Sequence, residues 1–274
     1  MPEGPEIRRA ADRLDRSLRG RRLRHVHCGL ERLKELPQAL EDTRVLGVEA
    51  RGKAMLTRFD NGRVLYTHNQ LYGRWEILPD GDYPASSRSL RLALHTGEWM
   101  ALLYSASEIE LLTEAELAGH PYLRKLGPEL LAPETGESEI IARFEDPRFR
   151  RRALFGLLQD QSFVSGMGNY LVCEALFVAG VHPQNRLADL DADQRRELAR
   201  ACLDLTRRSH ATGGITNDLA LAVELERQGV DFEGRRFRVY RREGLPCYRC
   251  GQAIEKGRYG GRMGYRCPGC QRMR

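Results

Sequence analysis

Long apolar runs are absent from this 274-residue sequence. The longest, WMALLY at residues 99–104, is far shorter than the roughly 20 residues that cross a bilayer. The first ten residues include charged side chains and no apolar stretch of signal-peptide length. We therefore expect neither a membrane segment nor a secretory signal, and we expect a cytoplasmic location. Hydrophobic residues still make up 41% of the chain, which suffices for the cores of about two domains.

Cysteine is scarce until the end of the chain. Three of the seven cysteines are scattered through the first 246 residues: Cys28, Cys173 and Cys202. Such a distribution does not fit a secreted disulfide framework. The other four form the motifs CYRC and CPGC, which are sixteen residues apart: Cys247, Cys250, Cys267 and Cys270.

Two close thiolate pairs joined by a loop of hairpin length can complete a tetrahedral shell around one Zn²⁺. We therefore predict one zinc ion at these four cysteines. Its role should be structural, because four thiolates leave no open position for chemistry. Two disulfides or a redox pair are the alternatives, and the expected cytoplasmic location and the lack of a flanking βαβ pattern argue against both.

Positive charge is concentrated at the same end of the chain. The formal net charge is +6, but residues 235–274 hold 12 Lys and Arg against 2 acids, which leaves the rest slightly acidic. Within the cysteine loop, EKGRYGGRMGYR combines glycines with Arg258, Arg262 and Arg266. A glycine-rich hairpin can approach a groove closely while guanidinium groups bind phosphate oxygens. A solvated arginine-rich tail explains the composition about equally well.

Strand-like segments dominate the first half, and no helix of crossover length separates them. An amphipathic helix precedes them and ends at Gly20; its apolar residues recur at helical spacing: Ile7, Ala11, Leu14 and Leu18. Six short segments rich in β-formers follow, with turn signals between them: residues 43–50, 54–59, 63–68, 74–78, 90–95 and 99–104. The absence of crossovers favours an antiparallel sandwich or barrel over a parallel sheet.

The second half has a helical period from about Thr113 onward. Prolines and glycines in LGPELLAPETGE, residues 126–137, suit a linker. We predict helices around four segments: residues 138–144, 151–159, 169–179 and 191–208. Residues 209–236 show no clear period and are compatible with a loop.

A glycine turn, GMGN at residues 166–169, directly precedes the third of these helices. Backbone N–H groups at a helix N-terminus, with Asn169 as the cap, would form an anion-binding site. Most glycine turns of this kind are only turns, so the motif alone is weak evidence. Asp160 and Glu174 flank the turn, and we interpret both as structural hydrogen-bonding groups.

The opening MPEGPE places a proline directly behind the initiator methionine. A small second residue allows an aminopeptidase to remove Met1, which would leave the secondary amine of Pro2 free. An α-amino group with a pKa near 7.8 is unprotonated about 400 times more often at pH 7 than a lysine near 10.4. Pro2 would then be a competent nucleophile, and the iminium that it forms would be cationic without a further proton.

Six motifs occur in the order and spacing of one family: MPEGPEI, RGK at residues 51–53, HNQLYG at 68–73, LGPE, GMGNYL and the four-cysteine tail. Over nearly the whole chain, they resemble the formamidopyrimidine-DNA glycosylase/endonuclease VIII family, and its bacterial endonuclease VIII branch in particular. The resemblance implies an α+β, multidomain fold. Its parts would be an N-terminal helix with an antiparallel β-sandwich (residues 1–125), a linker (126–135), a helix–two-turn–helix domain (136–234) and a zinc-bound β-hairpin (235–274).

The resemblance also implies an activity, that of a bifunctional DNA glycosylase and AP lyase of base excision repair. Pro2 would attack C1′ of the damaged nucleotide, and Glu3 would donate the proton that opens the sugar. Lys53 would assist elimination, and Arg262 would bind the phosphate beside the lesion and assist the second elimination. Taken alone, Glu3 is better explained as an acid at a helix start, and Lys53 as a solvated charge on a strand.

Five further residues would contact DNA. By the resemblance, Gln70, Leu71 and Tyr72 would form a wedge that fills the gap left by the extruded nucleotide, although buried packing is the default for two such apolar side chains. Lys125 and Asn169 would contact backbone phosphates. Lys125 departs from relatives that carry arginine there; lysine keeps the charge but loses the bidentate fork.

Contiguous QLY and the start MPEGPEI favour oxidised pyrimidines of the thymine glycol type as substrates. GGIT, at residues 213–216 of a segment longer than we expect for an endonuclease VIII, is similar instead to the branch that acts on formamidopyrimidines. Oxidised purines are therefore an alternative, and a non-catalytic zinc protein that binds bent or damaged DNA is a third. All three share a double-stranded DNA partner, and we expect a nucleoid-associated monomer without an obligate protein partner.

Overall fold

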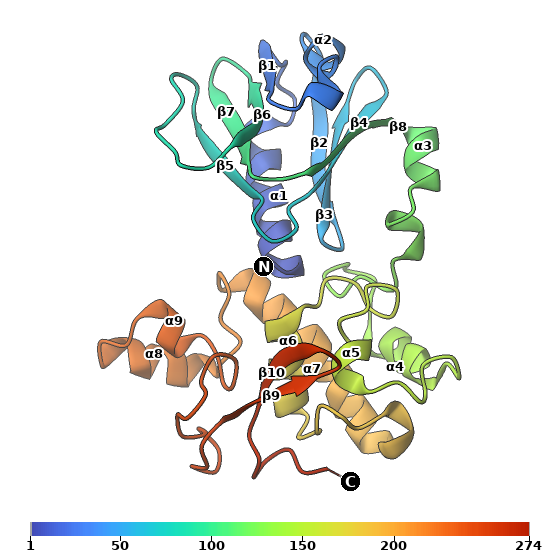
Figure 1. Cartoon of the computed structure of the whole chain (residues 1–274), viewed down its shortest axis with the longest axis vertical. Helices are drawn as coiled ribbons and strands as arrows, with labels where there is room; N and C mark the ends of the chain where they lie inside the picture. Colours follow the sequence, from blue (N-terminus) through green and yellow to red (C-terminus); the bar gives the residue numbers. More distant parts are fainter. Residues whose placement is uncertain (1, 274) are drawn as a thin grey trace. The chain divides into compact units, whose positions relative to one another are not determined.

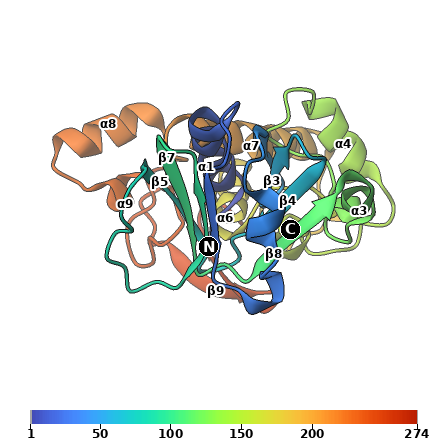
Figure 2. The same cartoon turned by 90° about the horizontal axis from the view of Figure 1, so that it is seen from above.

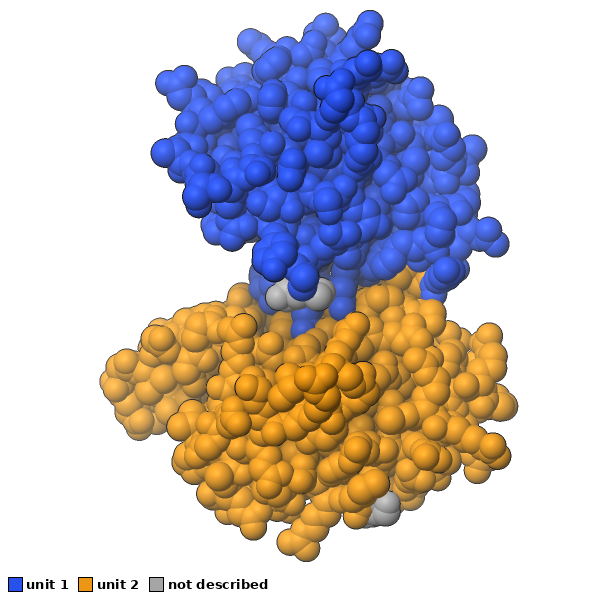
Figure 3. Space-filling model, in the orientation of Figure 1, with its two compact units in different colours: residues 1–125 blue, residues 126–274 orange. Residues whose placement is uncertain are grey.

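The computed structural model describes residues 2–273 of the chain, which form two compact units (Figure 3). Residues 1–125 belong to the first unit and residues 126–274 to the second. No helix within residues 2–273 is both long and apolar enough to cross a membrane.

Strands of the first unit form two four-stranded antiparallel sheets (Figure 1). One has the order β1-β6-β7-β5, with β1 (His25–Cys28), β5 (Arg74–Pro79), β6 (Leu90–His95) and β7 (Trp99–Tyr104). The other has the order β2-β3-β4-β8, with β2 (Val45–Arg51), β3 (Ala54–Phe59), β4 (Arg63–His68) and β8 (Glu108–Thr113). The predicted antiparallel sandwich is confirmed.

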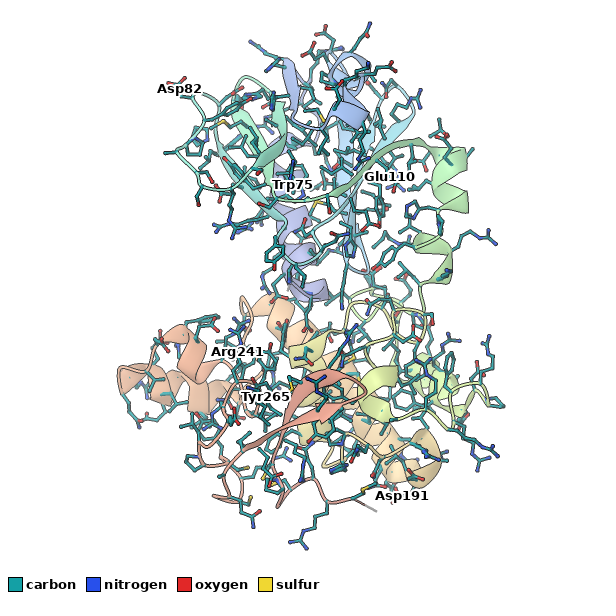
Figure 4. The ribbon with its side chains drawn as sticks, in the orientation of Figure 1. Trp75, Asp82, Glu110, Asp191, Arg241 and Tyr265 are labelled. Atoms are coloured by element: carbon teal, nitrogen blue, oxygen red, sulfur yellow. The ribbon has the colours of Figure 1, made fainter. Side chains whose placement is uncertain are left out.

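The predicted N-terminal helix is present as α1 (Gly4–Leu18). Its buried stripe includes all four apolar residues that recur at helical spacing in the sequence. This stripe packs against strands of both sheets, because α1 contacts β2 and β3 of one and β5 and β7 of the other. Trp75, labelled in Figure 4, belongs to the same core and is 5% exposed. The helix therefore closes the sandwich core and brings the chain start to the end of the unit where the β2–β3 hairpin turns (Figure 1).

Two strands, β1 and β8, were not expected from the sequence. β1 is only four residues long, HVHC, and two of those residues are histidines. β8 ends at Thr113, the residue from which we expected the helical period, and lies in a stretch for which we predicted no element. Each is the edge strand of its sheet and pairs with a single neighbour, so a short or polar segment is tolerated there. Two short helices connect β1 to β2, η1 (Glu31–Leu33) and α2 (Leu36–Leu40), and two more follow β8, α3 (Glu114–Gly119) and η2 (Leu123–Lys125).

The second unit is mainly helical, as predicted. Its longer helices are α4 (Glu137–Glu145), α6 (Asn169–Val178) and α7 (Ala192–Ala211), with a short turn, η3 (Leu187–Asp189), between the last two. The helix expected over residues 151–159 is shorter, α5 (Leu154–Leu157). Ala153 instead forms an antiparallel bridge with Arg186, which holds the preceding backbone in an extended conformation.

Residues 209–236, whose pattern was ambiguous and compatible with a loop, are largely helical. α7 extends to Ala211, and two further helices follow, α8 (Leu219–Arg227) and α9 (Phe232–Arg235), which project from the rest of the unit (Figures 1 and 2). The carboxylates of Asp218 and Asp231 accept hydrogen bonds from backbone N–H groups in the first turns of α8 and α9. The pattern was missed because apolar residues lie on both faces of α8: Ala222 is buried, whereas Val223 is exposed. The sequence therefore shows no clear amphipathic period.

The C-terminal segment forms a two-stranded hairpin, β9 (Glu255–Tyr259) and β10 (Arg262–Arg266). Gly260 and Gly261 make its two-residue turn with φ of 56° and 83°, values that glycine adopts at little cost. Tyr265 of β10, labelled in Figure 4, packs edge-on against Tyr240. One buried cluster runs from Leu130 through the helices to this segment, so residues 126–273 share a single core.

Candidate functional site

The chain start lies beside a cavity of about 540 Å³ in the first unit. Pro2 is half-buried and lines this cavity together with Glu6, Asn69 and Leu71. Removal of Met1, which the proposed chemistry needs, concerns a residue outside the described ones.

Glu3 is the N-cap of α1, and only 3% of its surface is exposed. It forms a capping box with Glu6: the Glu3 side chain accepts from the N3 backbone, and the backbone N–H of Glu3 donates to Glu6 Oε2 at 3.0 Å. Glu6 also forms an ion pair with Arg9 at 3.1 Å. The role at a helix start that the sequence suggested for Glu3 is therefore present, and Pro2 precedes Glu3 directly in the chain.

Lys53 lies in the two-residue turn between β2 and β3, whereas we had placed it on a strand. Gly52 enters this turn with φ of 60°, and Lys53 follows it. The backbone N–H of Lys53 donates to the hydroxyl of Tyr122 at 3.0 Å. Burial lowers the pKa of nearby His68, and the positive charge of Lys53 lowers it further, while Glu108 opposes both effects. Lys53 is half-buried, and the hydrogen bond to Tyr122 holds the backbone of its turn.

The loop between β4 and β5 presents two apolar side chains to solvent. Leu71 is 55% exposed and Tyr72 is 71% exposed, so the default of buried packing is wrong for both. Gln70 has φ of 51°. Its side-chain amide forms two hydrogen bonds near the start of β8: Nε2 donates to Glu108 at 3.0 Å, and Oε1 accepts from Ser107 at 2.8 Å. The loop is therefore fixed at Gln70 and open at the next two residues.

Two more contacts fix the shape of this loop. The backbone N–H of Gly73 donates to the Asn69 carbonyl at 2.7 Å, and a Cβ at Gly73 would come within 2.5 Å of that oxygen. Only glycine fits this close approach without a shift of the backbone. Arg88, from the β5–β6 connection, donates from Nη1 to the Tyr72 carbonyl at 2.9 Å.

In the second unit, the hairpin tip contacts the turns that precede α6. Arg262, the first residue of β10, is exposed, and its Nη1 donates to Gln159 Oε1 at 2.6 Å. Asn169 Nδ2 donates to the Met263 carbonyl at 3.0 Å. Asn169 is the first residue of α6 rather than its cap, because Gly168 occupies the N-cap position. Two residues predicted to bind phosphate, Arg262 and Asn169, are thus brought to one surface.

Asp160 and Glu174 are structural hydrogen-bonding groups, as we interpreted them. Asp160 accepts from the backbone and hydroxyl of Ser162 and pairs with Arg152 at 2.7 Å. Burial raises the pKa of Asp160, but these partners outweigh burial and lower it overall. Glu174 is fully buried and accepts hydrogen bonds from Thr216 and from three successive backbone N–H groups at residues 238–240. It therefore fastens the chain that leads to the cysteine segment onto α6.

Lys125 is exposed and ends the 3₁₀ helix η2, the last element of the first unit. It offers a cation at the surface without the forked geometry of an arginine.

The four cysteines at the C-terminal end converge. Their sulfur atoms all lie within 4.8 Å of one another: Cys247, Cys250, Cys267 and Cys270. The distance between Sγ of Cys247 and Sγ of Cys270 is 3.9 Å, and that between Cys250 and Cys267 is 3.3 Å. Zn–S bonds of about 2.3 Å in a tetrahedron place sulfurs roughly 3.8 Å apart, so the cluster is positioned for zinc binding.

Charge explains why this cluster calls for a cation. A hydrogen bond from the Gln252 backbone lowers the pKa of Cys250 to about 7. Burial raises the pKa of Cys267 and that of Cys270. One thiol therefore ionises readily while others resist, and a divalent cation supplies the positive charge that stabilises several thiolates together.

Sequence reasoning missed two residues of these surfaces, Gln159 and Arg88. Gln159 belongs to no motif, and nothing in the sequence signals its burial, which only the structure shows. Arg88 lies in a connection rich in serine, where an arginine suggests only a solvated charge. Both act through contacts with residues that are distant in the sequence, and no local pattern reports such contacts.

Two family models match the chain. The formamidopyrimidine-DNA glycosylase N-terminal domain matches residues 1–105, and the formamidopyrimidine-DNA glycosylase H2TH domain matches residues 126–220. Together the two models cover well over half of the chain.

Among curated proteins, endonuclease 8 of Escherichia coli O17:K52:H18 is 45% identical over 271 residues, which is 99% of this chain and 100% of that protein. Endonuclease 8 of Shigella sonnei is 44% identical with the same coverage. Among solved structures, Lactococcus lactis Fpg (MutM) in complex with DNA containing N7-benzyl-Fapy-dG has a TM-score of 0.83 at 21% identity, covering 99% of this chain and 100% of that one. MutM in complex with DNA containing carbocyclic 8-oxo-G has a TM-score of 0.82 at 21% identity and the same coverage.

Proposed function

Because the chain belongs to the formamidopyrimidine-DNA glycosylase/endonuclease VIII family, whose members are base-excision-repair DNA glycosylases and AP lyases, we propose that it acts on oxidised pyrimidines. The chain is a bifunctional DNA glycosylase and AP lyase. Relatives named endonuclease 8 match it at 44–45% identity over their whole length, which supports the pyrimidine branch. The contiguous, exposed QLY loop supports the same choice.

In the proposed mechanism, the free amine of Pro2 attacks C1′ of the damaged nucleotide. Glu3 protonates the sugar ring oxygen as the C1′–O4′ bond opens, and the base departs. The covalent product is an iminium, whose positive charge is an electron sink for loss of phosphate. Support comes from the position of Pro2 at a cavity and from the burial of Glu3, the next residue in the chain.

Lys53 and Arg262 would assist the two eliminations. Lys53, half-buried on a braced turn, would take part in proton transfer during elimination of the 3′ phosphate. Arg262 would bind the phosphate next to the lesion and stabilise it as the leaving group of the second elimination, which leaves a one-nucleoside gap. β,δ-elimination is therefore the expected outcome.

Leu71 and Tyr72 would enter the duplex as the apolar wedge, with Gln70 fixed at its base. Extruding a nucleotide costs a few kcal/mol, which inserted apolar side chains offset. Lys125 and Asn169 would contact backbone phosphates. Asn169 Nδ2 has two hydrogens and gives one to Met263, so one is left for a phosphate oxygen.

The four-cysteine cluster would hold one structural Zn²⁺, with Cys247, Cys250, Cys267 and Cys270 as its ligands. When bound, the ion would link the four thiolates and offset their negative charge. It would have no open coordination position. We further propose that the partner is damaged double-stranded DNA, that a monomer suffices, and that the protein works at the bacterial nucleoid in the cytoplasm.

A single observation carries the proposal: Pro2 lines a cavity that the exposed Leu71 and Tyr72 also line, and the next residue in the chain, Glu3, is buried. Borohydride trapping on duplex DNA with thymine glycol tests it. We expect a covalent adduct through Pro2. A variant with an extended N-terminus turns that nitrogen into an amide, so it should form no adduct, and trapping at the wild-type level there would refute the mechanism.

Oxidised purines are the second candidate, because GGIT begins the segment whose helices α8 and α9 project from the second unit. Trapping rates on thymine glycol and formamidopyrimidine duplexes under one set of conditions decide between them. We expect the thymine glycol duplex to react faster. DNA binding without trapping on either substrate would instead indicate a non-catalytic DNA-binding protein.

A further inference from the structure

Gln159 is buried beneath the tip of the β9–β10 hairpin, with 8% of its surface exposed. Its Nε2 donates to the Phe155 carbonyl at 3.1 Å. Its Oε1 accepts the hydrogen bond from Arg262 Nη1 at 2.6 Å. Because Nε2 is committed to a carbonyl, which only accepts, the oxygen is the end that faces Arg262.

The next two residues of β10 are held as well. Asn169 donates to the carbonyl of Met263 at 3.0 Å. Gly264 lies so close to the ring of Phe155 that a Cβ there would come within 2.5 Å of a ring carbon. The segment before α6 and the start of α6 therefore hold three successive hairpin residues, and Gln159 holds the one whose side chain carries charge.

This contact orients Arg262 without neutralising it. Within residues 2–273 no carboxylate forms an ion pair with Arg262, whereas Arg266 on the same strand pairs with Glu255 at 2.6 Å. An amide oxygen has no net charge, so the guanidinium keeps its full positive charge for an anion. A carboxylate in place of Gln159 would hold the same nitrogen but compete with a phosphate.

We propose that Gln159 is a positioning residue for the second elimination, because its amide oxygen holds the Arg262 guanidinium in the orientation that binds the phosphate beside the lesion. The inference rests on the proposed function of Arg262 and adds a residue to it. An arginine held in advance loses less side-chain freedom when it binds phosphate. The side chain of Gln159 bonds to Phe155 and Arg262 of its own unit, whereas Pro2 and Glu3 belong to the first unit, so base release and the first elimination should not depend on it.

Gln159→Met tests the proposal, because it keeps the length of the side chain and removes the acceptor. On duplex DNA with a preformed abasic site, the products of β-elimination and of β,δ-elimination are separated by gel electrophoresis. We expect the ratio of δ to β product to fall about tenfold, as for loss of a hydrogen bond to a charged group, with trapping at Pro2 and zinc content unchanged. The matched variant Gln38→Met, on the exposed surface of α2, should keep the wild-type ratio.

Gln159→Glu provides a second, independent measurement. It keeps an acceptor for Arg262, removes the Nε2 donor to the Phe155 carbonyl as Gln159→Met also does, and adds a negative charge, so the δ to β ratio should fall again. The slope of log affinity against log salt should also become shallower by about 0.9, because one phosphate fewer is neutralised. Gln159→Met should keep the wild-type slope, since its arginine stays charged. If Gln159→Met fails to fold, the product ratio and the salt slope of Gln159→Glu alone decide whether Gln159 positions Arg262.

Arg262→Ala separates failure of the inference from failure of the proposed function. A wild-type δ to β ratio in Arg262→Ala would show that Arg262 has no part in the second elimination. A lowered ratio in Arg262→Ala together with a wild-type ratio in both Gln159 variants would overturn only the role of Gln159. Equal loss of trapping and of δ-elimination in Gln159→Met would indicate a purely structural residue and would also overturn it.

Discussion

At the scale of single residues, Glu3 has to satisfy two demands that differ chemically. As the N-cap of α1 it must accept a backbone hydrogen bond, which glutamine also does. As a proton donor it needs a titratable oxygen. We therefore expect Glu3→Gln to keep the melting temperature and to slow base release from a thymine glycol duplex about 100-fold in single-turnover assays.

Glu116→Gln makes the same substitution in the capping box of α3, at its N3 position and at an exposed site. It should alter neither the melting temperature nor the rate. A Glu3→Gln protein that melts earlier yet releases base at the wild-type rate would mean that Glu3 serves the helix alone.

At the scale of elements, the hairpin depends on how closely it lies on α5. A Cβ at Gly264 would meet the Phe155 ring at 2.5 Å and Tyr259 at 2.8 Å, and both side chains are buried. We expect Gly264→Ala to cost about 1–3 kcal/mol through overpacking and to lift β10 from its contacts. The melting temperature and the δ to β product ratio should both fall.

Gly257→Ala is the matched control, because Gly257 pairs with Gly264 across the hairpin. Its added Cβ would meet only the hydroxyl end of Tyr259, at 3.0 Å. We expect a smaller loss of stability there. Equal losses in the two variants would argue against the close approach to Phe155 as the cause.

Elements that repeat a pattern could be predicted from the sequence, and those defined by distant partners could not. α1 and six strands show their buried face as a period of apolar residues. β1 and β8 carry weak patterns, which their edge positions tolerate. The cysteine spacing predicted the cluster, since ligands must be close in space. The Gln159–Arg262 contact joins residues 103 positions apart and has no local signal.

At the scale of the whole molecule, the cysteine segment shares its core with the helices of the second unit, because Cys267 is fully buried in that core. We expect Cys267→Ser to lose zinc, DNA binding and cleavage, while the first unit, which has its own core, stays folded. Metal analysis and hydrogen exchange resolved by residue check this. Cys28→Ser, in β1, should retain all three properties, and a zinc-free protein with full activity would contradict the prediction.

Affinity for DNA should depend on salt through charged contacts only, which distinguishes two of the proposed phosphate-binding residues, Lys125 and Asn169. Lys125 neutralises a phosphate and releases a counterion, so Lys125→Ala should make the slope of log affinity against log salt shallower by about 0.9. Asn169 is neutral, so Asn169→Ala should weaken binding at every salt concentration and leave the slope unchanged. Fluorescence anisotropy with a duplex that carries a stable abasic-site analogue measures both quantities. Lys34 is an exposed lysine beside α2, and Lys34→Ala should keep the wild-type slope. A wild-type slope in Lys125→Ala as well would show that Lys125 does not contact a phosphate.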